Sequence, residues 1–179
     1  MSEIDSLIQN YRRFAALPWQ ASISGSEKVW FAVYDPSQER RVRLRLEEFQ
    51  IATQEAGHTW RLVDLTDSFA RWMADHRYRE SYFESPEDLE PALPTYTTAV
   101  ITQLQDELAA PDVDEATVVA VLGAGSLFGL SYVSDVIEKA APHIRGRLLV
   151  FFPGHHEGNN YRLLDARDGW NYLAIPITA

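Results

Sequence analysis

Hydrophobic and polar residues follow two different periods along the chain, and their alternation predicts strands separated by helices. Short apolar-rich runs are typical of strands buried in a sheet. They occupy residues 29–34, 60–66, 117–123 and 147–152. Elsewhere apolar residues recur every three or four positions, as on the buried face of a helix. Helices are expected over residues 2–16, 97–110 and 131–141, between Asp35 and Gly57, and after Thr66 or Asp67.

The order of these elements predicts an α/β fold. Strands that alternate with helices need crossover connections, which favour parallel pairing. We expect a mainly parallel central sheet flanked by helices on both faces, in a P-loop-like or Rossmann-like three-layer arrangement. Residues 161–166 and 171–177 indicate a C-terminal antiparallel hairpin that turns at Arg167-Asp168-Gly169. Residues 78–96, rich in proline and acids, indicate an irregular connection with one short helical turn.

Length, charge and cysteine content narrow the classes of function. The 179 residues, 46% of them hydrophobic, predict one domain over 1–179. The 16 Lys and Arg against 26 Asp and Glu give a formal charge of −10, opposite to that of a typical nucleic-acid-binding protein. We therefore expect no direct binding to nucleic acid. The absence of cysteine excludes disulfides, thiolate zinc sites and cysteine nucleophiles.

The chain also lacks the sequence signals of export and membrane insertion. No apolar run approaches the roughly 20 residues that a membrane-spanning helix needs. The first residues, MSEIDSLIQNYRRF, contain early acids and lack the basic start and apolar run of a signal peptide. These features predict a cytoplasmic protein that does not bind membranes.

The carboxyl ends of the expected parallel strands gather several polar residues at one edge of the sheet, where ligands bind in such folds. The candidates for this strand-end crevice are Asp35, Asp64, Asp67, His155 and Glu157. Asp64 and Asp67 flank a strand end, where they could act as general acid or base. Helix capping explains Asp67 with fewer assumptions.

The adjacent residues His155, His156 and Glu157 invite a metal-site interpretation. Successive side chains of an extended chain point to opposite sides, so His155 and Glu157 could share an ion that His156 could not reach. Two ligands are too few for a protein metal site. A third could come from Asp35, Asp64 or His143, but a loop with two exposed histidines is a commoner explanation than a metal site. We therefore predict no metal here.

Gly123, Gly125 and Ser126 lie between a strand and a helix, the context of a phosphate-binding loop. The pattern is incomplete, because Phe128 replaces the third glycine of the dinucleotide fingerprint and no lysine follows as in a P-loop. The strained turn of hydrolases, G-x-S-x-G, is also absent. We therefore expect no cofactor, no catalytic residues and no enzymatic activity.

Two further groups of side chains are assigned to packing or to contacts. Arginines 40, 41, 43 and 45 are expected to form a solvated helix face paired with glutamates. Most tryptophans fall at inward positions of strands or helices. Trp170 lies beside the expected hairpin turn instead, and we predict that it is an exposed anchor for a protein partner.

Residues 118–177 resemble the BrxB family of bacteriophage-exclusion (BREX) defence systems. The matching features are the turn Gly-Ala-Gly-Ser-Leu-Phe after an apolar strand, the strand end Phe151-Phe152-Pro153-Gly154, the strand Tyr161-Arg162-Leu163 and the aromatic strand around Asn171-Tyr172. In the first half of the chain, VWFAVYDPSQERRVRLRLEEF (29–49) and WRLVDLTD (60–67) are also similar to that family. The resemblance has no established catalytic residues to transfer.

This resemblance implies a component of a multi-protein phage-resistance system, in which other members supply the ATPase, the DNA methyltransferase and the PglZ-type phosphatase or phosphodiesterase. The preferred hypothesis is a non-catalytic adaptor that binds a PglZ-like partner and other BREX proteins. The alternative is a nucleotide-binding or hydrolytic α/β enzyme that uses the strand-end crevice. A third hypothesis is a degenerate nucleotide-hydrolase fold that keeps its shape without binding phosphate.

Overall fold

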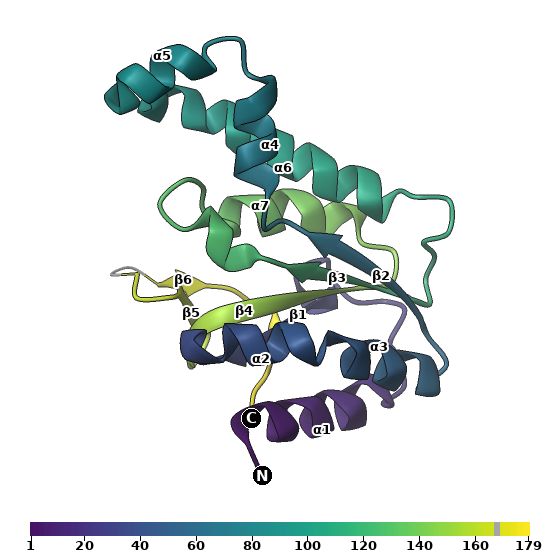
Figure 1. The fold of residues 1–179 in the computed structure, drawn as a ribbon. Coiled ribbons are helices and arrows are strands. Elements are labelled where there is room, and N and C mark those ends of the chain that lie inside the picture. Colours follow the sequence, from purple (N-terminus) through teal and green to yellow (C-terminus); the bar gives the residue numbers. More distant parts are fainter. Residues whose placement is uncertain (167–168) are drawn as a thin grey trace.

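Five strands run side by side in the order β2-β3-β4-β1-β7, and every pair of neighbours on this path is parallel (Figure 1). The computed structural model describes residues 1–166 and 169–179. Its strands are β1 (Val29–Tyr34), β2 (Thr59–Asp64), β3 (Thr117–Leu122), β4 (Arg147–Glu157), β5 (Asn160–Leu163), β6 (Trp170–Asn171) and β7 (Ile175–Ile177). Strands β5 and β6 are antiparallel additions to the end of β4. The mainly parallel sheet expected from the sequence is therefore a mixed sheet.

The C-terminal part of the chain differs from the expected simple hairpin. Residues 171–177 do not form one strand, because β6 pairs with β5 whereas β7 pairs with the free edge of β1. Pro176 lies in β7, the last strand of the path, where a missing N–H group costs no bond to a further strand. Residues 153–157, expected as a loop, continue β4 and pair with β5. Of the expected turn, Arg167 and Asp168 lie outside the described residues.

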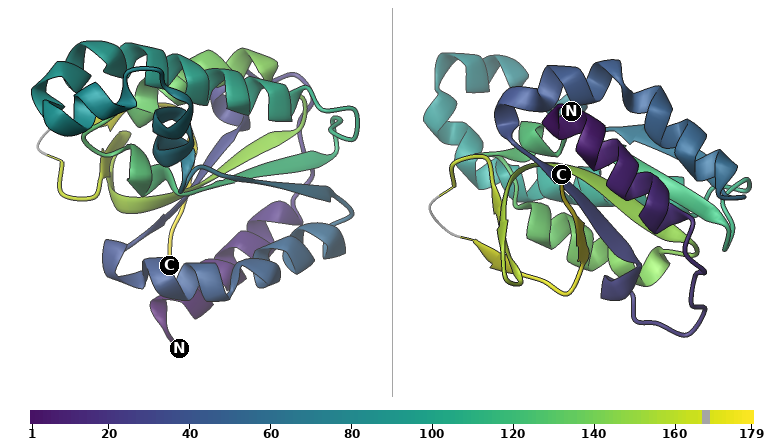
Figure 2. Two further views of the ribbon diagram at one scale, coloured as in Figure 1. Left: turned by 45° about the horizontal axis from the view of Figure 1, so that its top comes forward. Right: turned by 90° about the horizontal axis from the view of Figure 1, so that it is seen from below.

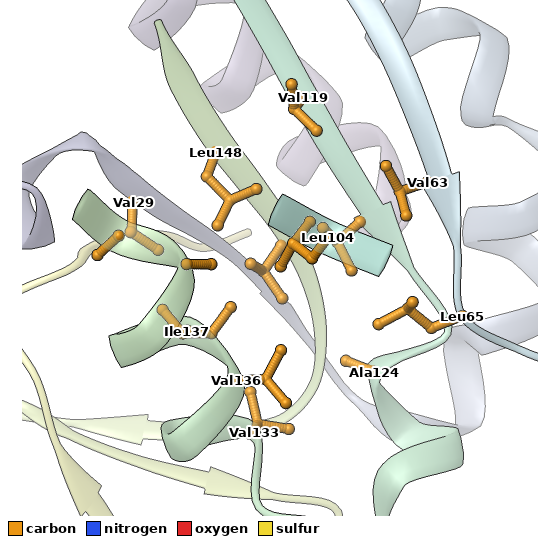
Figure 3. Packing of buried hydrophobic residues seen from close by; sticks show 14 of the residues in the cluster. Val29, Val63, Leu65, Leu104, Val119, Ala124, Val133, Val136, Ile137 and Leu148 are labelled. Carbon is orange, nitrogen blue, oxygen red and sulfur yellow. The ribbon is translucent and has the colours of Figure 1, made fainter. Parts of the chain in front are cut away.

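Helices cover both faces of the sheet (Figure 2). One face is covered by α1 (Glu3–Ala15), α2 (Glu39–Leu44) and α3 (Leu46–Glu55), and the other by α6 (Leu93–Leu108) and α7 (Val133–Ala140). The alternation of side chains along β1 explains how one strand serves two cores, because Trp30 packs on the first face and Phe31 on the second. Figure 3 shows the second core, in which Leu104 of α6 and Ile137 of α7 lie over the sheet.

The connection over residues 78–96 is more helical than expected. It contains α5 (Arg79–Glu84), the 3-10 helix η3 (Pro86–Ala92) and the first turn of α6, and it follows α4 (Ser68–Asp75). Pro94 lies in the first turn of α6, where a missing N–H group is tolerated. Conversely, the helix expected up to Gly57 is interrupted at Arg45 between α2 and α3. Within the described part of the chain, no helix combines the length and apolar character needed to cross a membrane.

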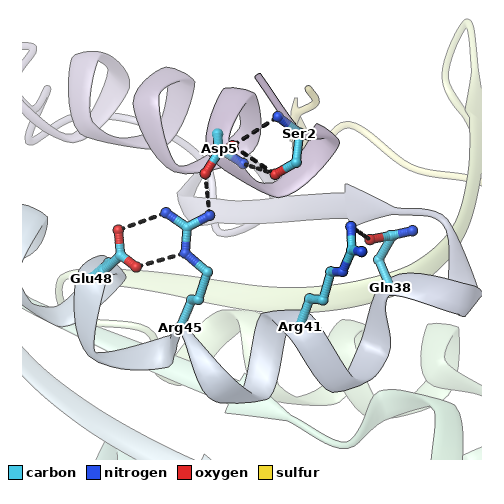
Figure 4. A network of polar contacts seen from close by, with 6 residues as sticks. All are labelled: Ser2, Asp5, Gln38, Arg41, Arg45 and Glu48. Atoms are coloured by element: carbon cyan, nitrogen blue, oxygen red, sulfur yellow. Dashed lines mark hydrogen bonds and ion pairs between the residues drawn. The ribbon is translucent and has the colours of Figure 1, made fainter.

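The interruption at Arg45 is tied to the start of α1 by a network of polar contacts (Figure 4). Ser2 caps α1 and exchanges hydrogen bonds with Asp5, including a 2.8 Å bond from Ser2 Oγ to Asp5 Oδ2. The Arg45 guanidinium donates to Asp5 and to Glu48, the latter at 2.6 and 2.9 Å. Hydrogen bonds from Ser2, and then that from Arg45, hold the pKa of Asp5 well below its usual range. The network thus joins α1 to the α2–α3 junction.

The lowered pKa of Asp5 predicts a dependence of stability on pH. Because the carboxylate is favoured in the folded state, its contribution is present above the unfolded-state pKa of about 3.9 and is lost as the pH falls below it. The variant Asp5→Asn should therefore be less stable than the wild type at pH 7, and its free energy of unfolding should fall less steeply below about pH 4. Urea denaturation at a series of pH values measures both effects.

The matched control is Asp106→Asn, which changes an exposed aspartate of α6. It should keep the pH dependence of the wild-type protein. Equal slopes for Asp5→Asn and the wild type in acid would contradict the assignment of this network to folding stability.

Candidate functional site

The carboxyl ends of β1 to β4 form the edge of the sheet at which the sequence places its candidate site. The helices after β1 cover one face, and those after β2 and β3 cover the other. The chain therefore changes face where β1 and β4 lie side by side. In open α/β sheets, this point is where ligands bind.

Asp35 and His155 lie just beyond paired residues of β1 and β4 at this point, because Tyr34 pairs with Pro153. Asp35 follows β1 and caps the 3-10 helix η2 (Pro36–Gln38) by accepting a 2.9 Å hydrogen bond from the Ser37 N–H group. Its own N–H group donates to Glu3 Oε1 of α1 at 2.9 Å. The bonds from Ser37 lower the pKa of Asp35, and the nearby His155 imidazole on β4 lowers it further by a smaller amount. The structure thus brings together two of the residues that the sequence predicts for the crevice.

A series of hydrogen-bonded side chains connects the ends of β1 and β2. The buried Tyr34 hydroxyl donates to Glu39, and Arg43 Nε donates to Glu39 at 2.7 Å. The same guanidinium donates to Thr66 Oγ1 at 2.9 Å, and Asp64 Oδ1 accepts the Thr66 N–H group at 2.9 Å. Burial and the bond to Glu39 raise the pKa of Tyr34. Glu39 and Asp64 therefore both accept hydrogen bonds from neighbouring residues.

The sequence interpretation did not assign Arg43, Tyr34 or Glu39 to this site. The expected pairing of the arginines with glutamates is confirmed for Arg43 with Glu39 and for Arg45 with Glu48. The additional contact of Arg43 with Thr66 joins residues that are distant in the sequence. The helical spacing of Glu39 and Arg43 indicates their mutual bond, but no local pattern indicates the strand that Arg43 reaches.

The remaining acidic candidates do not converge on the same point. Asp67 occupies the N-cap position of α4, yet its side chain makes no capping hydrogen bond. Glu157 is exposed at the far end of β4, opposite Asn160. His155 and His156 alternate along β4 as expected, and the His156 ring packs against Tyr161 with its centroid 4.6 Å away. Among the described residues, no group of three or more His, Asp or Glu could hold a metal ion.

The glycines proposed for a phosphate loop have a clear packing role. Gly123 has a φ of +86°, and a Cβ atom there would lie 2.6 Å from the backbone nitrogen of Thr66. At Gly125, a Cβ atom would lie 3.3 Å from Pro153 Cγ. Residues Ala124–Leu127, including Ser126, form the 3-10 helix η4, and α7 begins only at Val133. The glycines thus allow the ends of three strands to pack closely, and they do not lead directly into an α-helix.

Trp170 is less exposed than the sequence predicted. It is half-buried, with its ring stacked on Tyr172 at a centroid distance of 4.4 Å and 5.7 Å from Phe31. Its Nε1 atom donates to Glu138 Oε1 at 3.3 Å. These contacts bind β6 to the core, because β6 is too short to be held by pairing alone.

The projection formed by α5 and η3 (Figure 1) carries exposed aromatic side chains, and Phe128 and Tyr132, which precede α7, are exposed as well. Phe83 is 68% exposed and Tyr78 is 48% exposed. Beside the projection, a pocket of about 340 Å³ opens between α4 and α6. A 2.7 Å hydrogen bond between the hydroxyls of Ser68 and Tyr96 lies at this pocket. Other lining residues are Arg71, Trp72, Asp75, His76 and Gln103.

The packing at Gly123 can be tested against a second glycine with almost the same backbone angle. Gly57 has a φ of +84°, and nothing lies within 4 Å of a Cβ atom there. Gly57→Ala should lower the free energy of unfolding by about 1–2 kcal/mol, the cost of left-handed backbone. Gly123→Ala should cost an additional ~1–3 kcal/mol, because the methyl group meets the Thr66 backbone. Urea denaturation compares the two, and equal losses would contradict the close approach of the loops.

Comparison with known proteins adds no family to this description, since no protein-family model, curated protein or solved structure matches the chain. The site is therefore defined by its geometry: a polar edge with Asp35 beside His155, and a separate projection with exposed aromatic residues.

Proposed function

We propose that the chain is a non-catalytic adaptor of a BREX-type anti-phage defence complex and that it binds a PglZ-like protein. The resemblance of residues 118–177 to the BrxB family supports the pathway. The projection formed by α5 and η3 supports the adaptor role. The single observation that carries this role is the exposure of Phe83 and Tyr78 on that projection.

An aromatic side chain that is exposed in the free protein contributes favourable free energy to binding when a partner buries it. Full burial of a phenylalanine side chain contributes about 1.5–3 kcal/mol, and aromatic residues are enriched among the residues that dominate binding. No described residue of α5 or η3 is buried, so the packing of the domain itself does not account for this aromatic surface. A partner that covers it would supply the missing burial.

The charge of the projection indicates the chemistry of the partner surface. Six acidic residues lie on α4, α5 and η3, namely Asp75, Glu80, Glu84, Glu87, Asp88 and Glu90. The arginines of residues 68–92 are Arg71, Arg77 and Arg79, so acidic residues remain in excess. The PglZ-like partner should therefore present an apolar hollow with a basic rim, because complementary charge favours association and excludes other partners.

In this proposal the strand-end edge has an architectural role within a P-loop-like or Rossmann-like three-layer fold. The turn after β1 reads Asp35-Pro36-Ser37-Gln38, where a P-loop has glycines followed by lysine. Asp35 caps that turn, and Glu39 and Asp64 are bonded to Arg43 and Thr66. These bonds hold the loops in place and support an interpretation in which the edge is structural.

The adaptor role predicts that Phe83→Ala weakens binding to the PglZ-like protein about tenfold or more, because an anchor worth at least ~1.4 kcal/mol is removed. Co-purification and calorimetric titration with the purified partner measure the effect. Because Phe83 is exposed, thermal unfolding of the isolated variant should match that of the wild type. The control is Leu44→Ala on α2, which removes another exposed apolar side chain and should bind normally. Failure of the wild-type chain to associate with the partner would refute the proposal.

The alternative, a nucleotide-binding or hydrolytic protein, is favoured by one observation, the approach of His155 to Asp35 where β1 and β4 meet. Titration of the wild-type chain with ATP or GTP and Mg²⁺ distinguishes it from the adaptor. Under the alternative, nucleotide stabilises the protein against heat, and Asp35→Asn reduces that stabilisation.

A further inference from the structure

A second pocket lies at the edge of the sheet opposite to the strand-end site. It has a volume of about 240 Å³ and is formed where β1, β4 and β7 begin, beneath the segment that joins α1 to β1. Arg147 is the first residue of β4, and Ile175 is the first residue of β7. The other lining residues are Phe14, Leu17, Pro18, Trp19, Gln20, Ile23, Glu27 and Trp30.

The unusual feature of this pocket is a buried positive charge. Arg147 is 6% exposed. Its guanidinium donates to the carbonyl oxygens of Gly146 at 3.0 Å and Gln20 at 2.9 Å. Unlike Arg43 and Arg45, it forms no ion pair with a carboxylate of the described residues. Burial of a cation without an anion is costly, and a buried arginine normally has such a partner.

A second group in the same pocket also lacks an acceptor. The Nε1 atom of Trp19 is buried and has no hydrogen-bond partner among the described residues. The Arg147 guanidinium carbon lies over the Trp19 ring, 4.8 Å from its centroid, so the cation stacks on the ring whose N–H group is unpaired. A guanidinium with unused N–H groups and an unpaired indole N–H group together require an acceptor that has negative charge.

Apart from Gln20 and Glu27, the remaining walls are apolar and aromatic. Trp30 packs edge-to-face against Phe14, with ring centroids 4.8 Å apart, and against Trp19 at 5.6 Å. Ile175 and Ile23 complete the apolar lining. Such surfaces suit the hydrocarbon or aromatic part of a small molecule.

The acidic lining residue limits the charge that the pocket can accept. Glu27 lies at the rim, where its carboxylate accepts hydrogen bonds from the Ser24 N–H group and hydroxyl at 2.9 and 2.7 Å. One guanidinium compensates one negative charge, and Glu27 disfavours a second. We propose that this pocket binds a monocarboxylate with an apolar or aromatic body, its carboxylate on Arg147 and the Trp19 N–H group and its body against Trp30, Phe14 and Ile175.

The proposal is tested with a pair of ligands that differ in charge and hardly in shape. Calorimetric titration of the full chain with 3-phenylpropionate should show binding, whereas 3-phenylpropionamide should bind at least tenfold more weakly. Equal binding of the acid and the amide, or no binding of the acid at millimolar concentration, would overturn the proposal. This comparison needs no variant and so does not depend on the folding of a mutant.

Two variants then assign the contacts. Arg147→Met keeps an unbranched side chain but removes the charge and the N–H groups, and should weaken binding of 3-phenylpropionate at least tenfold. Trp19→Phe keeps an aromatic ring but removes the N–H group, and should weaken it several-fold. The control, Arg13→Met, removes an exposed arginine of α1 and should bind as the wild type does. Wild-type affinity in Arg147→Met would also overturn the proposal.

The carboxylate could belong to a free small molecule or to the C-terminus of a peptide. Titration with acetyl-Gly-Gly-Phe and with its C-terminal amide separates the sources. Tighter binding of the peptide acid than of 3-phenylpropionate supports the proposal with a chain terminus as the occupant. Weaker binding of the peptide acid supports it with a small molecule as the occupant.

Discussion

The burial of strand β4 on both faces and along both edges is the constraint on which the rest of the structure depends. Its residues from Leu148 to Phe152 are almost fully buried; all of them pair with β1, and those up to Val150 also pair with β3 on the other side. A strand in this position must be apolar on both faces, because each face contacts a separate helical layer. The two cores are therefore joined through one apolar segment, and both candidate binding regions of the sheet lie at its ends.

The ends of β4 differ in their chemistry because they leave the core in different ways. At the start of β4, the charged group of Arg147 is buried and does not reach solvent. The carbonyl oxygens and the indole ring around it partly replace water. At the other end, β4 continues beyond Tyr34, the last residue of β1, and pairs with β5. The extension brings His155 beside Asp35, so the geometry of the strand-end edge follows from the length of one strand.

The sequence predicted the features that depend on local patterning. The four apolar-rich strands, the helices that begin near residues 2, 97 and 131, and the helical layers on both faces follow from periods that are visible within short segments. The pairing of residues 171–177 could not be predicted in this way. A short apolar segment can pair with either of two free strand edges, and its own residues do not select one. The helical character of residues 79–92 was hidden by prolines that are tolerated in first turns and 3-10 helices. The meeting of Trp19 with Arg147 depends on the tertiary structure, and no spacing in the sequence indicates it.

The insertion of β4 between β1 and β3 also has a consequence for the way in which the protein folds. Val29 pairs with Leu148 and Val119 pairs with the same residue, so β1 has no strand partner until β4 has been synthesised, whereas β2 and β3 pair directly with each other. Until then β1 exposes an apolar strand with both edges open, the kind of segment that associates with other chains during synthesis. The pairing of distant segments must overcome a large loop-closure entropy, so folding of this domain should be slow for its size. The stage at which the chain is most exposed to misassembly is therefore the interval between the synthesis of β1 and that of β4.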